Sequence, residues 1–352
     1  MQYQENDQPV ETSLEKRLDE LKAGAEPAFA ARLESPEAFR EWRKSAKEAL
    51  CSALGLSGKE SAGSLPAKDV GTRDRGELQE TKIYIDRSAG VRIPVYRLRA
   101  TDGPRHKGRI LVFHGHNPNV QYCLGNYPDA ETEARMRAKD NHYAEGLARE
   151  GWEVFAVEQQ GFGERQTARR AYLHDGTIGS SCRDLSLQYV AVGKTLLGER
   201  VRDGMAVLDF LESGAEAGSM TGVTGNSGGG TTALWLAALD ERVDVCVPGS
   251  YLCRFRDSIY AVPHCDCNYV PGILNLFEMG DIAALVAPRP FCAIHGERDP
   301  IFPVEGTRAA FATVQAAYDL LQKPGHCRLA LHEGAHAYRI AEAVDWFGRF
   351  SG

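Results

Sequence analysis

The sequence predicts an α/β fold in which helices cover both faces of a mostly parallel sheet. From residue 109 onward, short apolar runs alternate with helical stretches, which is the pattern of repeated βαβ units. The apolar runs are continuous, as is typical of strands buried on both faces. The chain has 352 residues, 43% of them hydrophobic and 25% charged, so it is long enough to bury a large core.

Each part of the chain has an expected place in this fold. Residues 82–86 and 91–98 predict two antiparallel strands joined by a turn at 88–90. The later strands are expected at 109–113, 153–157, 220–224, 243–247, 291–295 and 328–332. The helices between and after them are expected at 143–150, 199–212, 229–238, 304–321 and 338–350.

The first part of the chain predicts a helical extension. The run Ser35-Pro36-Glu37 supplies a capping hydroxyl, a proline at the first helical position and an acid near the positive end of the helix dipole. Apolar residues then recur at helical spacing until Gly55, which should end the helix. Residues 58–78 are rich in Gly, Ser, Lys and Asp and predict a linker. We therefore expect an extension and linker over 1–78 and a main domain over 79–352.

The run Gly225-Asn226-Ser227-Gly228-Gly229 lies between an expected strand and an expected helix. A serine on such a turn sits at strained backbone angles, and glycine two residues to either side lets strand and helix approach closely. The turn would aim the Ser227 hydroxyl at a pocket as a nucleophile. A glycine-rich loop before a helix can instead bind phosphate, but this run has no phosphate-loop lysine.

A serine nucleophile needs a base that is itself oriented by an acid, in the chain order serine, acid, histidine. Asp299 and His336 follow two later strands in that order. Glu297 and His332 compete for the two roles. Asp299 lies further into its loop and is followed by proline, whereas His332 is still within its strand pattern. We therefore expect a triad of Ser227, Asp299 and His336.

The loop 114–117 reads His-Gly-His-Asn and follows the expected strand 109–113. Glycine in this loop lets the backbone turn an amide toward the nucleophile. We expect the backbone N–H groups of His116 and Gly228 to form an oxyanion hole. The side chain of His116 is expected to fix the loop by hydrogen bonding.

Three residues are expected in the substrate pocket. The segment 250–286 is longer than a simple crossover, so it predicts a cap that brings His264 to the pocket. Asn226 adjoins the nucleophile, and Arg165 follows an expected strand, close to a second basic pair at Arg169-Arg170. These arginines could hold an anionic substrate.

The run His264-Cys265-Asp266-Cys267 is the one place where the sequence suggests a metal, because histidine and cysteine are zinc ligands. No second cluster has ligand spacing. We therefore expect a packing or pocket-lining role for this run, and neither a metal nor a cofactor.

These motifs in this order resemble the α/β-hydrolases, and within them the acetyl xylan esterase-like and dienelactone hydrolase-like group. The resemblance covers roughly residues 80–350 and rests on segments 114–117, 225–229, 281–290, 296–303 and 334–336. It implies a mostly parallel eight-stranded sheet and cofactor-free ester hydrolysis, including esters of plant carbohydrates. Dienelactone hydrolases use cysteine where this chain has Ser227, which argues against that branch.

The composition limits which binding partners and which cellular compartment we expect. The net charge of -7 creates no field that attracts nucleic acid, and no stretch approaches the roughly 18 apolar residues of a membrane span. The nine cysteines are scattered, which is typical of a reducing compartment. We expect a cytoplasmic protein, although removal of a secretion signal would leave the same sequence.

The sequence thus predicts a serine hydrolase that cleaves carboxylic esters of a small molecule or a glycan. Two alternatives stay open. One is an amidase or peptidase on the same triad, because leaving-group preference depends on the pocket. The other is a binding protein that has the fold without the activity.

Overall fold

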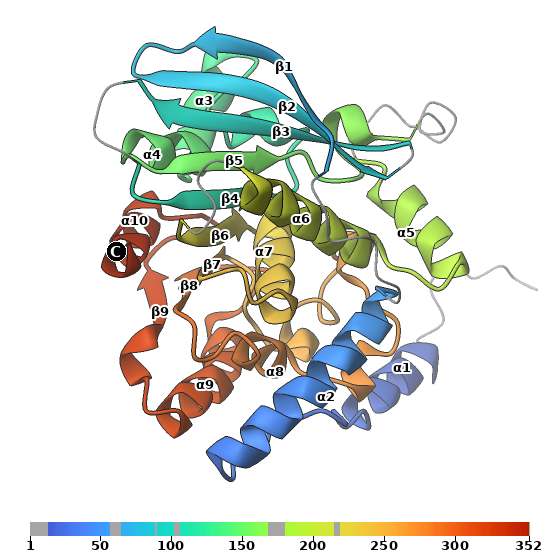
Figure 1. The fold of residues 1–352 in the computed structure, drawn as a ribbon. Helices are drawn as coiled ribbons and strands as arrows, with labels where there is room; N and C mark the ends of the chain where they lie inside the picture. Colours follow the sequence, from blue (N-terminus) through green and yellow to red (C-terminus); the bar gives the residue numbers. More distant parts are fainter. Residues whose placement is uncertain are drawn as a thin grey trace, which may run out of the picture.

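The computed structural model describes residues 13–56, 65–88, 90–101, 106–167, 180–214 and 219–351. Within these residues a single nine-stranded sheet crosses the molecule, from β1 at the top of Figure 1 to β9 at the lower left. In spatial order its strands are β1 (Ala67–Asp74), β2 (Leu78–Ser88), β3 (Val91–Ala100), β5 (Glu153–Val157), β4 (Arg109–Phe113), β6 (Thr221–Asn226), β7 (Val245–Gly249), β8 (Phe291–Gly296) and β9 (Cys327–His332). The strands from β5 to β9 in this order run parallel, and β1, β2 and β3 are antiparallel to their neighbours.

The expectation of eight strands is wrong by one, because β1 lies in the segment 58–78 that the sequence predicts as a linker. Every residue of β1 is exposed, so the strand has no apolar alternation that could reveal it. Backbone pairing with β2, in the register Ala67 with Ile85, holds it at the sheet edge. The predicted boundary at residue 78 therefore separates β1 from the sheet to which it belongs.

Helices pack on both faces of the sheet, as predicted. The helices are α1 (Ser13–Ala23), α2 (Pro36–Leu54), α3 (Ala130–Arg137), α4 (Tyr143–Arg149), α5 (Cys182–Ala191), α6 (Leu196–Ser213), α7 (Gly228–Leu239), α8 (Met279–Ala284), α9 (Val304–Leu320) and α10 (Ile340–Phe350). Successive residues of β4 point to two separate cores: Leu111 packs with residues of α2, α6 and α7, and Val112 with residues of α4 and α10. All five residues of β4 are buried.

The N-terminal helix α2 is part of the main core. Ser35 accepts a hydrogen bond from the backbone N–H of Ala38, and Gly55 ends the helix in the left-handed conformation, both as predicted. Phe39 and Leu50 are fully buried against the helices on one face of the sheet. The predicted apolar stripe therefore packs α2 against the main body of the protein.

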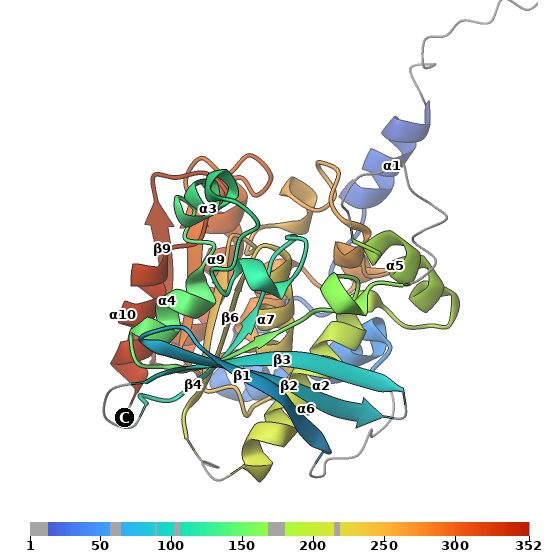
Figure 2. The same cartoon turned by 90° about the horizontal axis from the view of Figure 1, so that it is seen from above.

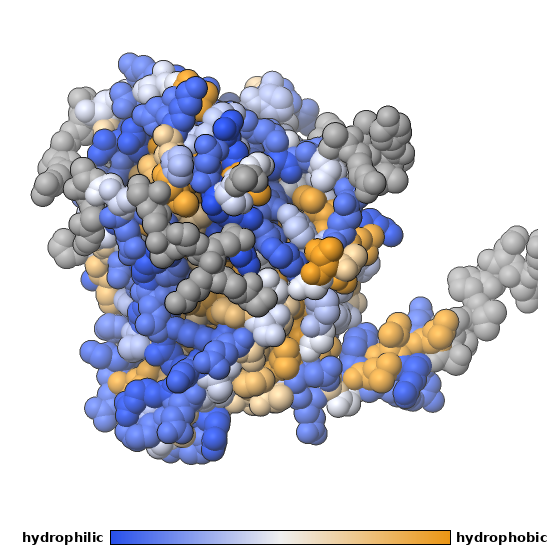
Figure 3. Space-filling model, turned by 45° about the vertical axis from the view of Figure 1, so that its right-hand side comes forward, coloured by the Kyte–Doolittle hydropathy of each residue, from blue (hydrophilic) through white to orange (hydrophobic). Residues whose placement is uncertain are grey.

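Helix α1 differs from α2, because it projects from the body of the molecule (Figure 2). Its leucines, Leu14, Leu18 and Leu21, are exposed, and Figure 3 shows an apolar face on this projecting helix. No helix in the described ranges is long and apolar enough to cross a bilayer.

The parallel strands bring four loops to one edge of the sheet. Ser227 follows β6 directly, and the loop 114–117 follows β4. Asp299 follows β8, and His336 follows β9. Ligand sites of open α/β sheets lie at this carboxyl edge, so the topology alone brings the predicted site residues to one region.

Candidate active site

Ser227 sits on a strained turn between β6 and α7. Its backbone angles are φ 56° and ψ -122°, a region that side-chain-bearing residues rarely adopt. A Cβ atom on Gly229 would overlap the carbonyl oxygen of Phe113 at the end of β4, and one on Gly225 would overlap the backbone of Gly229. The predicted strain at Ser227 and the predicted need for both glycines are therefore confirmed.

Asp299 and His336 form a hydrogen-bonded pair. The Nδ1 atom of His336 lies 2.6 Å from Oδ2 of Asp299, whose carboxylate is buried. Its other oxygen accepts hydrogen bonds from the backbone N–H groups of Ile301 and Phe302, at 3.0 and 3.1 Å. Burial tends to raise the pKa of Asp299, but His336 and these N–H groups hold the pKa below its ordinary value. The carboxylate is thus charged beside the imidazole.

The two competing residues have other partners. Glu297 is half exposed, and its carboxylate lies 3.7 Å from the guanidinium of Arg308. The ring of His332 is held by its own loop, because Nδ1 accepts from the backbone N–H of Gly334 and Nε2 lies 3.1 Å from the carbonyl of Ala337. The structure therefore pairs Asp299 with His336 and leaves both competitors outside the pair.

The loops that carry the pair are held together by backbone contacts. The N–H of Arg298 donates to the carbonyl of Gly334, at 3.0 Å. A Cβ atom on Gly296 would overlap the carbonyl of Ala335, so glycine at the end of β8 permits this approach. Phe302 also stacks on the His336 ring, with 5.7 Å between centroids and 14° between planes. The sequence gave no signal for this contact of Phe302.

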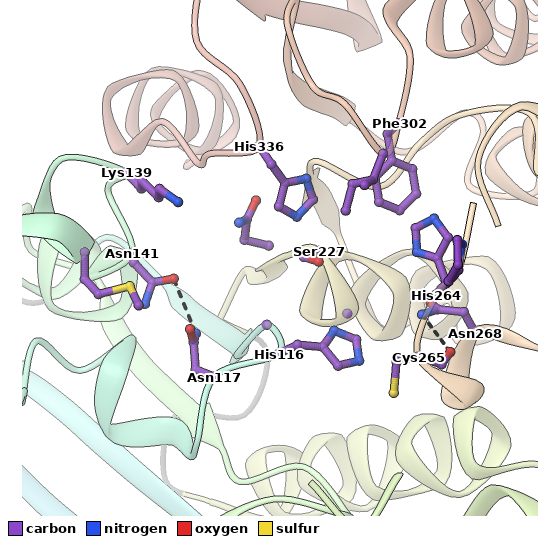
Figure 4. Close-up of a pocket in the computed structure, with 16 residues that line it drawn as sticks. His116, Asn117, Lys139, Asn141, Ser227, His264, Cys265, Asn268, Phe302 and His336 are labelled. Atoms are coloured by element: carbon purple, nitrogen blue, oxygen red, sulfur yellow. Dashed lines mark hydrogen bonds between the residues drawn. The ribbon is translucent and has the colours of Figure 1, made fainter. Parts of the chain in front are cut away.

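Ser227 and His336 line one pocket of about 440 Å³. Figure 4 shows Ser227 at its centre, with His336 on one side and His116 on the other. Residues 115 and 228 also line it. Among the described residues, the backbone N–H groups of His116 and Gly228 have no acceptor, so both can donate to a bound group.

Two of the three predicted pocket residues line this pocket. Asn226 and His264 are among its lining residues, and burial lowers the pKa of His264, which keeps its ring neutral at neutral pH. Arg165 does not line it, because its buried guanidinium binds the carboxylate of Asp203, at 2.5 Å. The run Arg169-Arg170 lies outside the described residues.

The pocket also has polar lining residues that sequence reasoning missed. Asn117 donates a hydrogen bond to Asn141, at 3.3 Å, and Lys139 lies on the same side of the pocket (Figure 4). Asn268 lies opposite, next to His264. These residues come from loops and short helices without a recognisable motif, so only the folded arrangement identifies them.

Two cysteines of the run 264–267 lie beside possible ligands from distant parts of the chain, which local ligand spacing could not indicate. His116 and Cys182 join Cys265 and Cys267, and the four donor atoms lie within 4.8 Å of one another. His264 is not a member of this group. Cys182 is 83 positions before Cys265, so no local spacing could reveal the cluster.

Comparisons with known proteins agree with the fold. No protein-family model matches the chain. A protein of Bacillus subtilis (strain 168) named "Putative hydrolase YtaP" is 27% identical over 257 residues, which are 70% of this chain and 78% of that protein.

Two solved structures show the likeness in three dimensions. "A putative acetyl xylan esterase" from Bacteroides fragilis NCTC 9343 has a TM-score of 0.74 at 19% identity, over 93% of this chain and 84% of that chain. A CE15 glucuronoyl esterase from Teredinibacter turnerae T7901 has a TM-score of 0.66 at 15% identity, over 97% and 93%. This chain thus has the α/β-hydrolase fold that its motifs predicted.

The strain at Ser227 should affect the stability of variants at this position. We expect Ser227→Gly to have a free energy of unfolding about 1 kcal/mol higher than Ser227→Ala, because glycine adopts a positive φ without strain. Urea denaturation of the two variants measures the difference. The same pair of substitutions at Ser45, inside α2, is the control, and there alanine should be the more stable by about 1 kcal/mol. Equal stability of the two Ser227 variants would contradict the strain.

Proposed function

We propose that this protein is a serine hydrolase that cleaves carboxylic esters through an acyl-enzyme. One observation carries the proposal: a serine on a strained turn shares a pocket with a histidine that is hydrogen-bonded to a buried carboxylate. A serine on such a turn and a histidine oriented by a carboxylate are the parts that nucleophilic catalysis by serine uses. The names of the structural neighbours, which are esterases, support the same class of reaction.

The reaction begins when His336 removes the proton from the Ser227 hydroxyl as its oxygen attacks the ester carbonyl. Asp299 holds the imidazole tautomer through Nδ1 and stabilises the charged ring that forms. The oxyanion of the tetrahedral intermediate lies against the N–H groups of Gly228 and His116, each worth on the order of 3 kcal/mol of barrier. His336 then gives its proton to the leaving alcohol.

Water completes the cycle. His336 takes a proton from a water molecule, whose oxygen attacks the acyl carbonyl, and the second tetrahedral intermediate expels Ser227. The carboxylic acid leaves, and the hydroxyl of Ser227 regains its proton from the histidine. No group beyond the three side chains and two backbone amides is required.

Glu297 and Asp299, two acids in the same loop, provide a matched test of the mechanism. We expect Asp299→Asn to lower kcat for an aryl acetate by roughly 10⁴-fold, because the imidazole loses its orienting charge. Glu297→Gln, two positions away and half exposed, should change kcat by less than about 2-fold. Initial rates of both purified variants measure the effect. If both substitutions had equal effects, Asp299 would not be the triad acid.

We propose that the substrate is an ester of a carbohydrate. The pocket is lined by polar side chains that can donate or accept hydrogen bonds, namely Asn117, Lys139, Asn141, Asn226, His264 and Asn268. Sugar hydroxyls can both donate and accept hydrogen bonds, so such a lining suits a carbohydrate. The segment 250–286 contributes His264 and Asn268 to this set. The neighbours named as acetyl xylan and glucuronoyl esterases support this substrate class.

Rates on glycan and simple esters test the substrate class. We expect acetate release from acetylated xylan, or methanol release from methylated pectin, to exceed turnover of a simple aryl ester. Asn141→Asp keeps the acceptor for Asn117 but replaces the amide of a pocket-lining side chain with a carboxylate, so it should lower kcat/KM on the glycan by about 10-fold and leave the aryl ester unchanged. Better turnover of aryl esters by the wild-type protein would count against a glycan substrate.

A further inference from the structure

Four metal-ligand side chains converge beside the pocket. The Nε2 atom of His116 lies 3.2 Å from Sγ of Cys267, and that sulfur lies 3.4 Å from Sγ of Cys265. Cys182 completes the set, and all four donor atoms lie within 4.8 Å of one another. Cys182 and Cys267 are buried, and Cys265 is half-buried.

We propose that His116, Cys182, Cys265 and Cys267 bind one zinc ion in a structural site. Zinc binds cysteine sulfur at about 2.3 Å and histidine nitrogen at about 2.0 Å in a tetrahedron, so its donors stand roughly 3.5 to 3.8 Å apart. The separations of 3.2 and 3.4 Å approach those of such a site. Three cysteines and one histidine are an established ligand set for structural zinc.

The charge of the surroundings supports a metal thiolate centre. Arg200 is 2% exposed and, among the described residues, has no carboxylate partner. Its guanidinium donates to Sγ of Cys182, at 3.0 Å, and to the carbonyl of Gln160. A buried cation needs a buried anion. Three thiolates with one divalent ion carry a single negative charge, which Arg200 balances.

The position of Cys182 in the fold favours a negatively charged sulfur. Cys182 is the first residue of α5, where the helix dipole favours a negative sulfur. Zinc requires deprotonated cysteine, so these surroundings favour the form that binds it.

The ligands come from three separate parts of the chain. His116 lies after β4, Cys182 begins α5, and the remaining two cysteines lie at the short helix η5 (Asp266–Asn268). Four protein ligands leave no open position, so the ion would join these segments and take no part in the proposed hydrolysis. The site does not depend on that function, because none of its four donor atoms belongs to the triad.

The test measures zinc on the full-length chain. We expect about one zinc per chain by elemental mass spectrometry, after reduction and incubation with zinc chloride and removal of unbound metal. Cys182→Ser and Cys267→Ser should each lower the retained zinc at least 10-fold. Cys51→Ser, which changes a half-buried cysteine of α2 outside the cluster, should retain it fully.

A second measurement does not depend on the folding of the variants. Cobalt(II) added to the reduced wild-type chain should give the intense visible absorption of a tetrahedral thiolate site and saturate at one equivalent. Equimolar zinc should abolish that absorption. Failure of the wild-type chain to retain stoichiometric zinc, equal retention by Cys182→Ser and Cys51→Ser, or a weak octahedral cobalt spectrum would each overturn the site. None of these outcomes bears on ester hydrolysis by Ser227.

Discussion

The close packing of α7 against the ends of β4 and β6 controls the geometry of the whole site. Gly225 and Gly229 carry no Cβ atoms, so the helix start reaches the carbonyl of Phe113. This approach accompanies the positive φ of Ser227, and Gly228 is the first residue of the helix, where backbone N–H groups have no partner within the helix. The approach also brings the loop after β4 beside the serine, because both lie at the same sheet edge. One packing constraint therefore positions both the proposed nucleophile and the two backbone amides proposed to bind the oxyanion.

The proposed acid and base, Asp299 and His336, depend on a second close approach, between the loops after β8 and β9. Gly296 gives the space, and the hydrogen bond from Arg298 to Gly334 holds the loops together. Phe302 then supports both members of the pair, since its N–H binds Asp299 and its ring stacks on His336. The two approaches meet in one pocket because parallel strands end at the same edge.

The sequence predicts features whose cause is local and misses those whose cause is distant. The turn at Ser227 and the helix cap at Ser35 depend on residues next to them in the chain, so the sequence predicted both. Strand β1 is fully exposed and carries no pattern. Arg165 was expected in the pocket, but its partner Asp203 lies 38 positions away. The cysteine cluster joins segments that only the folded chain brings together.

Covalent labelling of the folded protein with a fluorophosphonate, followed by peptide mass spectrometry, tests most directly whether Ser227 is an activated nucleophile. A hydroxyl with a paired histidine attacks the phosphorus, whereas an ordinary serine does not. We predict one adduct per chain, located on Ser227, absent in Ser227→Ala and formed far more slowly in His336→Ala. A folded wild-type chain that stays unlabelled, or an adduct that persists in Ser227→Ala, would contradict the proposed chemistry.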